Sequence, residues 1–279
     1  MKNYRTLQRL IDARPASDGD GVKIRRIAGA ELNKQLDPFL LLDEIASEDG
    51  ADYVGGFPSH PHRGFETITY MLEGAMRHRD HLGNEGVIAS GDVQWMTAGR
   101  GVIHSEMPEQ TDGLLHGFQL WLNLPASEKM KPAAYQEYAN ADIPLVDLPG
   151  GGSAKIIAGE FSENGTTVSG PVAPGTTQPT YLDIVLTPGE SWELAVNEEQ
   201  TVLLLVFDGA TTDLSAGQLG IYQQGNMLSM VASEQGARAL LLAGTPINEP
   251  INQYGPFVMN THDEIEQAIK DYNEGRLVA

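Results

Sequence analysis

Residues 60–74 read HPHRGFETITYMLEG, and residues 91–108 read GDVQWMTAGRGVIHSEMP. The first stretch holds an H-x-H pair, His60 and His62, and the second an H-x-E pair, His104 and Glu106. Because a strand sends alternate side chains to the same face, each pair points its two side chains the same way. Two such strands can bring three imidazoles and one carboxylate together. Nitrogen donors favour iron, copper, nickel or zinc, and a carboxylate suits iron or manganese, so the pattern predicts a divalent metal site.

These two stretches resemble the N-terminal signature of the pirin family, in the cupin superfamily. Residues 249–268, EPINQYGPFVMNTHDEIEQA, resemble the C-terminal signature of the same family. The resemblance covers nearly the whole chain and implies a bicupin. We therefore expect an all-β protein of two tandem cupin (jelly-roll) β-barrels with a short C-terminal helix. The resemblance also implies four metal ligands, which are His60, His62, His104 and Glu106.

The carboxylate ligand can be drawn in two ways. The general cupin motif reads H-x-H-x3/4-E and uses its glutamate as a ligand, and HPHRGFE places Glu66 in that position. The general second motif supplies one histidine, whereas here His104 is accompanied by Glu106. The pirin pattern favours Glu106, and Glu66 is the rival.

Composition indicates a folded, turn-rich chain. A hydrophobic content of 41% supports a real core, and the 31 Gly and 16 Pro are scattered between short apolar runs, as in all-β proteins. There is no cysteine, which excludes disulfides, thiolate ligands and a cysteine nucleophile.

The charge of the chain bears on its partners. Eighteen Lys and Arg against 38 Asp and Glu give a net charge of −20, without a basic cluster to neutralise phosphates. We therefore expect no direct nucleic acid binding. The first residues lack the apolar core of a signal peptide, and no apolar run approaches the ~20 residues of a membrane span. The sequence thus predicts a cytoplasmic protein that does not enter a membrane.

Both halves of the chain show the same rhythm of short apolar runs separated by Gly, Asp and Asn, which predicts strands. The predicted strands are residues 22–29, 39–46, 87–96, 102–107, 114–124, 154–161, 180–186, 191–196, 200–209, 227–232 and 237–244. The polar, Pro-containing segment 127–138 is the best linker candidate. We expect an N-terminal metal-binding cupin domain at 1–130 and a C-terminal cupin domain without metal ligands at 131–279, ending in a helix.

Histidines are unevenly distributed. Six of the seven lie at or before residue 116, and none occurs from 117 to 261. A second barrel without histidine cannot hold a histidine-based cupin metal. We interpret it as a structural or partner-binding domain.

A helix is predicted near the C-terminus. Thr261 followed by Glu264 forms a capping box, and Gly275 suits the position after the last turn. Between them an apolar stripe recurs at helical spacing and is expected to dock on a barrel. It consists of Ile265, Ala268, Ile269 and Tyr272.

The other histidines are given plainer interpretations. His78 and His81 flank a charged segment, HRDHLGNEG, that is typical of a solvated turn; the pirin pattern leaves the first of them a minor role at the mouth of the site. His116 lies in an apolar run and is predicted to be a hydrogen-bonded wall residue. His262, beside the helix cap, is predicted to be exposed.

The resemblance implies an Fe(2+)-dependent oxidoreductase similar to quercetin 2,3-dioxygenase, which opens the ring of a flavonol with O2. Glu106 is then the catalytic base that accepts the flavonol hydroxyl proton. Zn, Ni, Mn or Cu are alternative metals, and no organic cofactor is indicated. The alternative function is a non-enzymatic, iron-dependent redox regulator that binds a transcription or metabolic protein through the histidine-free second half.

Overall fold

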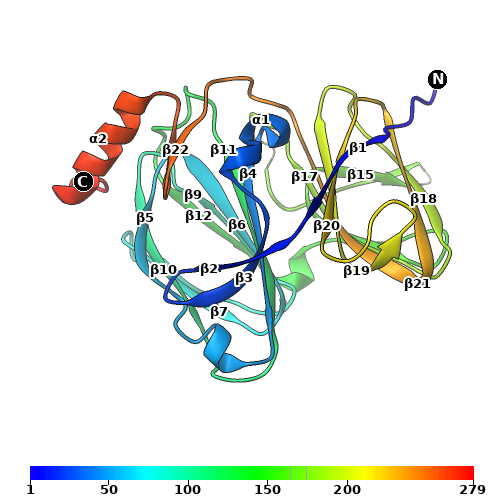
Figure 1. Ribbon diagram of the computed structural model, residues 1–279, viewed down its shortest axis with the longest axis horizontal. Helices are drawn as coiled ribbons and strands as arrows, with labels where there is room; N and C mark the ends of the chain where they lie inside the picture. Colours follow the sequence, from blue (N-terminus) through cyan, green and yellow to red (C-terminus); the bar gives the residue numbers. More distant parts are fainter. Residues whose placement is uncertain (164, 174) are drawn as a thin grey trace. The chain divides into compact units, whose positions relative to one another are not determined.

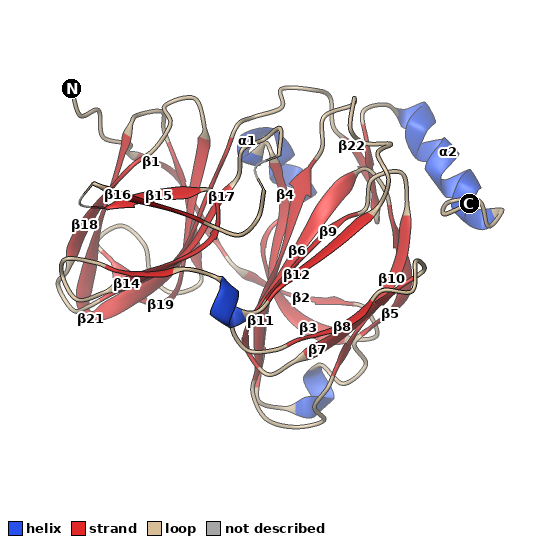
Figure 2. Ribbon diagram, turned by 180° about the vertical axis from the view of Figure 1, so that it is seen from behind, coloured by secondary structure: helices blue, strands red, loops and turns tan. Residues whose placement is uncertain are grey.

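The structure is a computed structural model that describes residues 1–163, 165–173 and 175–279. Strands dominate it, and the longest helix of the described residues is α2 (His262–Asn273), near the C-terminus (Figure 2). The predicted all-β class, with two cupin domains and a short C-terminal helix, is confirmed. Within the described ranges, no helix combines the length and the apolar character needed to cross a membrane.

Two compact units make up the chain, and neither is continuous in sequence. The first cupin unit comprises residues 14–33, 39–140 and 247–279. The second cupin unit comprises residues 1–13, 34–38 and 141–246. The sequence predicted one boundary, between residues 130 and 131. In the structure the N-terminal residues 1–13 belong to the second unit, and the C-terminal residues 247–279 belong to the first.

The first cupin unit contains two antiparallel sheets (Figure 1). The larger has the order β12-β9-β6-β11-β4-β3-β2. Its strands are β2 (Arg14–Asp18), β3 (Val22–Ala28), β4 (Phe39–Ser47), β6 (Phe65–Glu73), β9 (Val93–Thr97), β11 (Leu115–Asn123) and β12 (Ala134–Tyr138). The smaller has the order β5-β10-β7-β8, with strands β5 (Phe57–His62), β7 (Met76–Asp80), β8 (Glu85–Ile88) and β10 (Val102–Pro108). Buried side chains from both sheets form one core, which includes Ile24, Met71, Met76, Ile88 and Leu115.

The second cupin unit is built on one large sheet of order β1-β20-β19-β21-β17-β14-β13, with β18 paired to β21. Its strands are β1 (Leu7–Asp12), β13 (Leu145–Asp147), β14 (Ser153–Ala158), β17 (Thr180–Leu186), β18 (Ser191–Ala195), β19 (Thr201–Thr211), β20 (Gln218–Tyr222) and β21 (Met227–Gly244). A small hairpin joins β15 (Glu160–Glu163) to β16 (Thr166–Ser169). The runs 227–232 and 237–244, predicted as separate strands, form the single long strand β21. β19 carries the longest apolar run and is buried at the centre of this sheet.

Short helical turns connect some of the strands. They are α1 (Asn33–Leu36) and the 3-10 turns Ala30–Leu32, Gly50–Asp52 and Asn140–Asp142.

The C-terminal segment packs on the first cupin unit. It forms a hairpin of β22 (Asn252–Tyr254) and β23 (Phe257–Met259), followed by α2. The predicted capping box is confirmed, because the Thr261 hydroxyl accepts from the Glu264 amide and the Glu264 carboxylate accepts from the Thr261 amide. The apolar stripe docks as predicted: Ile265 and Ala268 are buried in a cluster that includes Ile103 of β10. Gly275 has φ +70°, as a residue after a helix end requires.

A buried lysine fastens this segment to the residues that follow His62. Lys129 is 1% exposed and donates from Nζ to three oxygen atoms. They are Asn123 Oδ1 at 2.6 Å, Gly64 O at 2.8 Å and Val258 O at 3.0 Å. Because Gly64 lies two residues after His62 and Val258 lies in β23, the lysine braces the end of β5 against the C-terminal hairpin.

Arg63 provides a second brace. Its side chain is 5% exposed, donates from Nη1 to Asp271 Oδ2 at 2.8 Å and from Nε to the Arg100 carbonyl. Gly64 has φ +94°, and a side chain there would meet the Val258 carbonyl at 1.9 Å. Only glycine permits this approach of the hairpin to the residues that follow His62.

Candidate metal centre

The two sequence pairs lie on neighbouring strands. β5 and β10 pair antiparallel, with His60 opposite His104 and His62 opposite Val102. β5 is an edge strand of its sheet, a position that tolerates Pro61 because proline has no backbone N–H to donate. A register shift between His104 and Glu106 interrupts the pairing.

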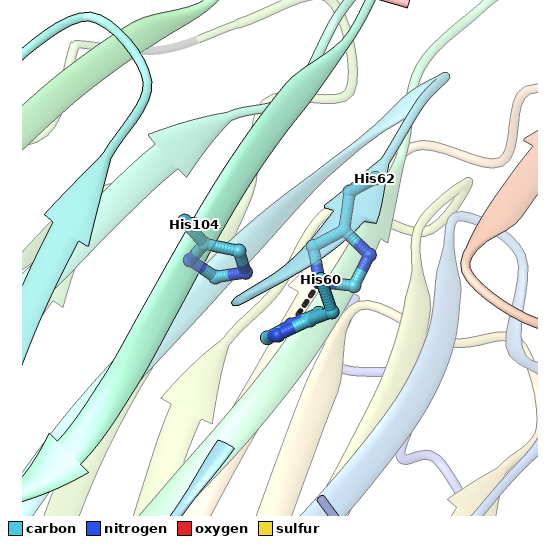
Figure 3. A group of neighbouring side chains, drawn as sticks. All are labelled: His60, His62 and His104. Carbon is cyan, nitrogen blue, oxygen red and sulfur yellow. Dashed lines mark hydrogen bonds between the residues drawn. The ribbon is translucent and has the colours of Figure 1, made fainter. Parts of the chain in front are cut away.

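Three imidazoles converge. In Figure 3 the rings of His60, His62 and His104 point toward one another, and their ligand atoms all lie within 4.8 Å of each other. The Nε2 atoms of His60 and His62 are 3.0 Å apart, and the ring centroids of His60 and His104 are 4.4 Å apart. His62 and His104 are buried, at 3% and 1% exposure.

The tautomer of His60 follows from its neighbour. Its Nδ1 lies 2.8 Å from the Pro58 carbonyl oxygen, which can only accept. Nδ1 therefore carries the hydrogen, and the lone pair of Nε2 faces the other two histidines. This is the outer hydrogen bond that orients metal-binding imidazoles in proteins.

The residues fit a divalent metal ion. Two nitrogen ligands each about 2.0–2.1 Å from one ion, at right angles, lie about 2.9 Å apart, close to the Nε2 separation in His60 and His62. Within the described residues, His104 Nε2 is buried and has no hydrogen-bond partner. A buried ring nitrogen without a partner is costly unless something else binds it.

Burial keeps two of these imidazoles neutral. It lowers the pKa of His62 well below the usual value, His60 adds to this effect, and the Pro256 carbonyl opposes it. The pKa of His104 is lowered well below its usual value by burial first, and by the neighbouring histidines His62, His60 and His78. A neutral imidazole keeps the lone pair that a metal ligand needs.

Glu106 is a buried carboxylate beside His104. It is 2% exposed, and its two oxygens are held separately: Thr69 Oγ1 donates to Oε1 at 3.0 Å and Gln119 Nε2 donates to Oε2 at 2.9 Å. Its ligand atom lies within 4.8 Å of those of His104 and His78. The sequence analysis did not predict Thr69 or Gln119 as site residues. They lie on the neighbouring strands β6 and β11 and both reach Glu106, so only the strand pairing could have indicated them.

Glu66 lies in a different setting. It stands on β6 of the larger sheet and accepts hydrogen bonds from Trp95 Nε1 at 3.0 Å, Thr97 Oγ1 at 2.7 Å and Lys131 Nζ at 3.2 Å. In the described part of the chain its carboxylate belongs to neither histidine cluster. The Glu66 carboxylate is therefore hydrogen-bonded to three side-chain donors.

The interpretation of His78 as part of a solvated turn is wrong. His78 is 0% exposed and lies on β7, opposite Glu106 of β10. The alternation of a strand turns Arg77 and Arg79 toward solvent and His78 inward. His81, in the turn that follows, is exposed.

Two other histidines behave as predicted. His116 is a hydrogen-bonded wall residue, with its Nε2 2.9 Å from Glu44 Oε1. His262 is exposed, with 78% of its side chain accessible.

A cavity of about 740 Å³ opens onto His60 and His62. Its size falls within the usual range of small-molecule sites. Its apolar and histidine lining includes Leu41, Phe57, His60, His62, Trp121 and Pro256. The Trp121 ring lies edge-on to His62, with centroids 5.2 Å apart, and packs on Phe65 at 4.3 Å. One wall of the cavity is therefore a fixed aromatic surface next to the histidines.

The polar wall of the cavity is acidic. Asp18 and Asp20 are exposed there. The cation of this wall, Arg26, is engaged by Asp43 through two hydrogen bonds of 2.9 and 2.7 Å and by Asp18 at 3.1 Å. The wall thus presents no uncompensated positive charge to a bound molecule.

Comparisons with known proteins agree with this architecture. The sequence models of Pirin and of the Pirin C-terminal cupin domain match residues 21–122 and 181–278. A Pseudomonas aeruginosa protein, provisionally named as a quercetin 2,3-dioxygenase, is 47% identical over 99% of each chain. Pirin from Homo sapiens is 38% identical over 95% of this chain and 91% of its own. The crystal structure of quercetin 2,3-dioxygenase from Acinetobacter baumannii superposes with a TM-score of 0.90 at 35% identity, over 99% of this chain and all of the other.

Proposed function

The chain belongs to the pirin family of bicupins, and from that premise we propose that it is a metal-dependent dioxygenase. In this proposal one divalent ion, iron in the working enzyme, is held by His60, His62, His104 and Glu106. The reaction is the oxidative ring opening of a quercetin-like flavonol with O2. The observation that carries the proposal is the convergence of His60, His62 and His104, with the buried Glu106 carboxylate beside His104. His60 and His62 line a cavity that has an aromatic wall.

The chemistry divides between the ion and the protein. A bound iron ion would supply Lewis acidity and redox chemistry for a reaction between an aromatic substrate and O2. The imidazoles contribute neutral nitrogen donors, because burial holds His62 and His104 uncharged. The cavity contributes orientation, since the Trp121 ring lines it beside His62.

Glu106 is the proposed base. Its carboxylate would accept the flavonol hydroxyl proton on one oxygen while the other stays hydrogen-bonded. Thr69 and Gln119 hold the two oxygens in place, so that the acceptor is aimed before the substrate arrives. A base fixed in this way loses little orientation freedom during proton transfer.

The substrate class follows from the lining of the cavity. Trp121, Phe57 and Leu41 suit a planar aromatic molecule, and the volume suits one of flavonol size. Asp18 and Asp20 disfavour an anionic group at the polar wall, and Arg26 is already paired. We therefore propose an uncharged polyhydroxylated aromatic substrate.

One experiment tests the proposal directly. The protein is purified, its metal content is measured, and the iron-loaded form is titrated anaerobically with quercetin before O2 is admitted. We expect an absorbance change of bound flavonol in the anaerobic stage, followed by flavonol loss and O2 uptake in equal amounts. Flavonol that neither binds nor reacts with the iron-loaded protein would refute the dioxygenase proposal.

A regulatory role is the second candidate. The observation that favours it is the absence of histidine from residues 117–261, which leaves the second cupin unit without imidazole ligands and available for a protein partner. In this alternative the redox state of iron in the first unit would control binding of a transcription or metabolic protein. Repeated turnover of flavonol with matching O2 uptake favours the dioxygenase proposal. Iron binding without turnover favours the regulatory proposal.

A further inference from the structure

His78 is placed against two proposed ligands by strand register. β7 pairs with β10 so that His78 lies opposite Glu106 and Asp80 lies opposite His104. The ring centroids of His78 and His104 are 5.1 Å apart, with an interplanar angle of 49°. His78 is 0% exposed, so a polar ring has been buried at the centre of the site. A buried polar ring calls for hydrogen-bond partners.

The hydrogen bond between the two rings has a direction. His104 Nδ1 and His78 Nδ1 are 3.4 Å apart, so one nitrogen donates and the other accepts. On the far side of His78, Nε2 makes no hydrogen bond among the described residues, and the Asp80 carboxylate lies 4.0 Å from it. The negative charge of Asp80 favours a hydrogen on that nitrogen. His78 then presents the lone pair of Nδ1 to His104. His104 carries its hydrogen on Nδ1 and leaves Nε2 without one.

We propose that His78 is a positioning residue that fixes the tautomer of His104, so that the lone pair of His104 Nε2 faces His60 and His62. The inference rests on the proposed metal site. It gives His104 an outer partner equivalent to the Pro58 carbonyl that orients His60. Outer partners of this kind hold metal-binding imidazoles in the correct tautomer and ring orientation.

The surroundings of His78 hold it in this role. The Tyr135 ring lies over it, with centroids 4.9 Å apart and an interplanar angle of 35°. Asp80 is itself fixed, because it accepts from the amides of Leu82 and Asn84 and from Asn84 Nδ2, at 2.9, 3.0 and 2.7 Å. The carboxylate behind His78 therefore cannot readily turn away.

Nitrogen-15 NMR of the unsubstituted, metal-free protein tests the tautomer without any mutation. The protein is labelled on its histidine rings, and long-range couplings identify which nitrogen of His104 is protonated at neutral pH. We expect the hydrogen on Nδ1. A hydrogen on Nε2 would overturn the proposal. After loading with Zn²⁺, a metal-induced shift of His78 Nδ1 would make His78 a ligand and would also overturn it.

Substitutions test the consequence for metal binding. His78→Asn keeps an acceptor near the position of Nδ1, whereas His78→Phe keeps the ring stacked on Tyr135 and removes the acceptor. The affinity for Zn²⁺ is measured by competition with a chelating indicator, with His262→Phe as the surface control. We expect His78→Phe to weaken binding by about 10–100-fold, as loss of such outer partners does. We expect His78→Asn and His262→Phe to bind like the unsubstituted protein.

The outcomes separate the two proposals. Equal weakening in His78→Asn and His78→Phe, or no weakening in His78→Phe, would show that the acceptor does not matter and would overturn the role of His78. An unsubstituted protein that binds no Zn²⁺ would refute the metal site of the proposed function, while the tautomer measurement would still decide the hydrogen bond between His78 and His104.

Discussion

His60 on β5 and His104 on β10 are direct cross-strand partners, and their ring centroids lie 4.4 Å apart. The proposed ligand set is therefore a property of strand register, since a shift of β5 by one residue would turn both His60 and His62 to the opposite face. Pro61 has no backbone N–H to donate, yet it lies opposite Ile103, so the register runs unbroken from His60 to His62.

We predict one metal ion per chain, held in the first cupin unit. Residues 117–261 contain no histidine, and within the described residues both candidate histidine clusters lie in the first cupin unit. Elemental analysis of protein reconstituted with Fe²⁺ should give one equivalent. A stoichiometric second ion in the second unit would contradict the prediction. Because affinity alone does not select iron, a purified sample is also expected to accept Zn, Ni or Mn.

We predict that His62→Ala and His104→Ala abolish metal binding and leave the fold intact. The core of the first unit rests on apolar packing of side chains such as Met71 and Leu115, which these substitutions do not touch. Metal analysis and circular dichroism check the two parts of the claim. A variant that keeps its metal would contradict the first part of the prediction, and a variant that unfolds globally would contradict the second.

Glu106→Gln and Glu66→Gln are predicted to differ. The amide is a weak ligand and a poor base, so Glu106→Gln should lose flavonol turnover and weaken iron binding. Glu66 bonds to Trp95, Thr97 and Lys131, and its substitution should leave the metal in place. Parallel measurements of iron affinity and turnover rank the two variants. If Glu66→Gln loses the metal and Glu106→Gln keeps it, the general cupin ligand pattern applies.

Gln119→Leu is predicted to slow turnover with little effect on stability. It removes the donor at 2.9 Å from Glu106 Oε2, so the base is held only by Thr69. We expect kcat to fall by about 10–100-fold, in the range for lost outer partners of a metal site. Gln218→Leu in the second cupin unit is the matched control, because its Nε2 donates to Asp12 Oδ1 at 2.8 Å, outside the first unit. A change confined to KM would indicate that Gln119 contacts the substrate and does not position Glu106.

The pairing of Arg63 with Asp271 predicts a pH-dependent contribution to stability. The hydrogen bond from Arg63 lowers the pKa of Asp271, and Gln267 adds to this effect. Because the folded pKa lies below the unfolded one, the contribution is complete above about 3.9, the usual aspartate value, and is lost as the pH falls through the folded pKa.

Asp271→Asn tests this dependence. At pH 7 the variant should melt at a lower temperature than the unsubstituted protein, and the gap should close as the pH is lowered below about 3.9. Thermal melts followed by circular dichroism across this range provide the measurement. A gap that stays constant down to the lowest pH would show that the carboxylate charge plays no part.

The sequence predicted the parts of the fold that depend on local pattern. The H-x-H and H-x-E pairs indicated which histidines gather because an alternating pattern survives in a strand whatever its partner. The capping box of Thr261 and Glu264 is equally local. His78 was missed because its neighbours in HRDHLGNEG are charged, although the alternation of Arg77, His78 and Arg79 already separated an inner from an outer face.

Long-range contacts could not be predicted from one sequence. Nothing in the pattern indicates that Lys129 joins Gly64 to Val258, or that Gln119 rather than another polar residue meets Glu106. Such contacts depend on the order of strands in a sheet, and strand order is a property of the whole chain. For the same reason the sequence leaves Glu66 and Glu106 as rival ligands.

The exchange of segments between the two units has a consequence for biosynthesis. The first cupin unit includes residues 247–279, so it lacks part of its cavity wall, including Pro256, until the ribosome has translated the second unit. At about 5–20 residues per second, that delay is on the order of ten seconds. During this interval the nascent chain contains the proposed histidine ligands but not the hairpin and helix of residues 247–279. If the proposed site is correct, a polypeptide that ends before residue 247 would carry every proposed ligand but would lack the hairpin and helix that complete the first cupin unit.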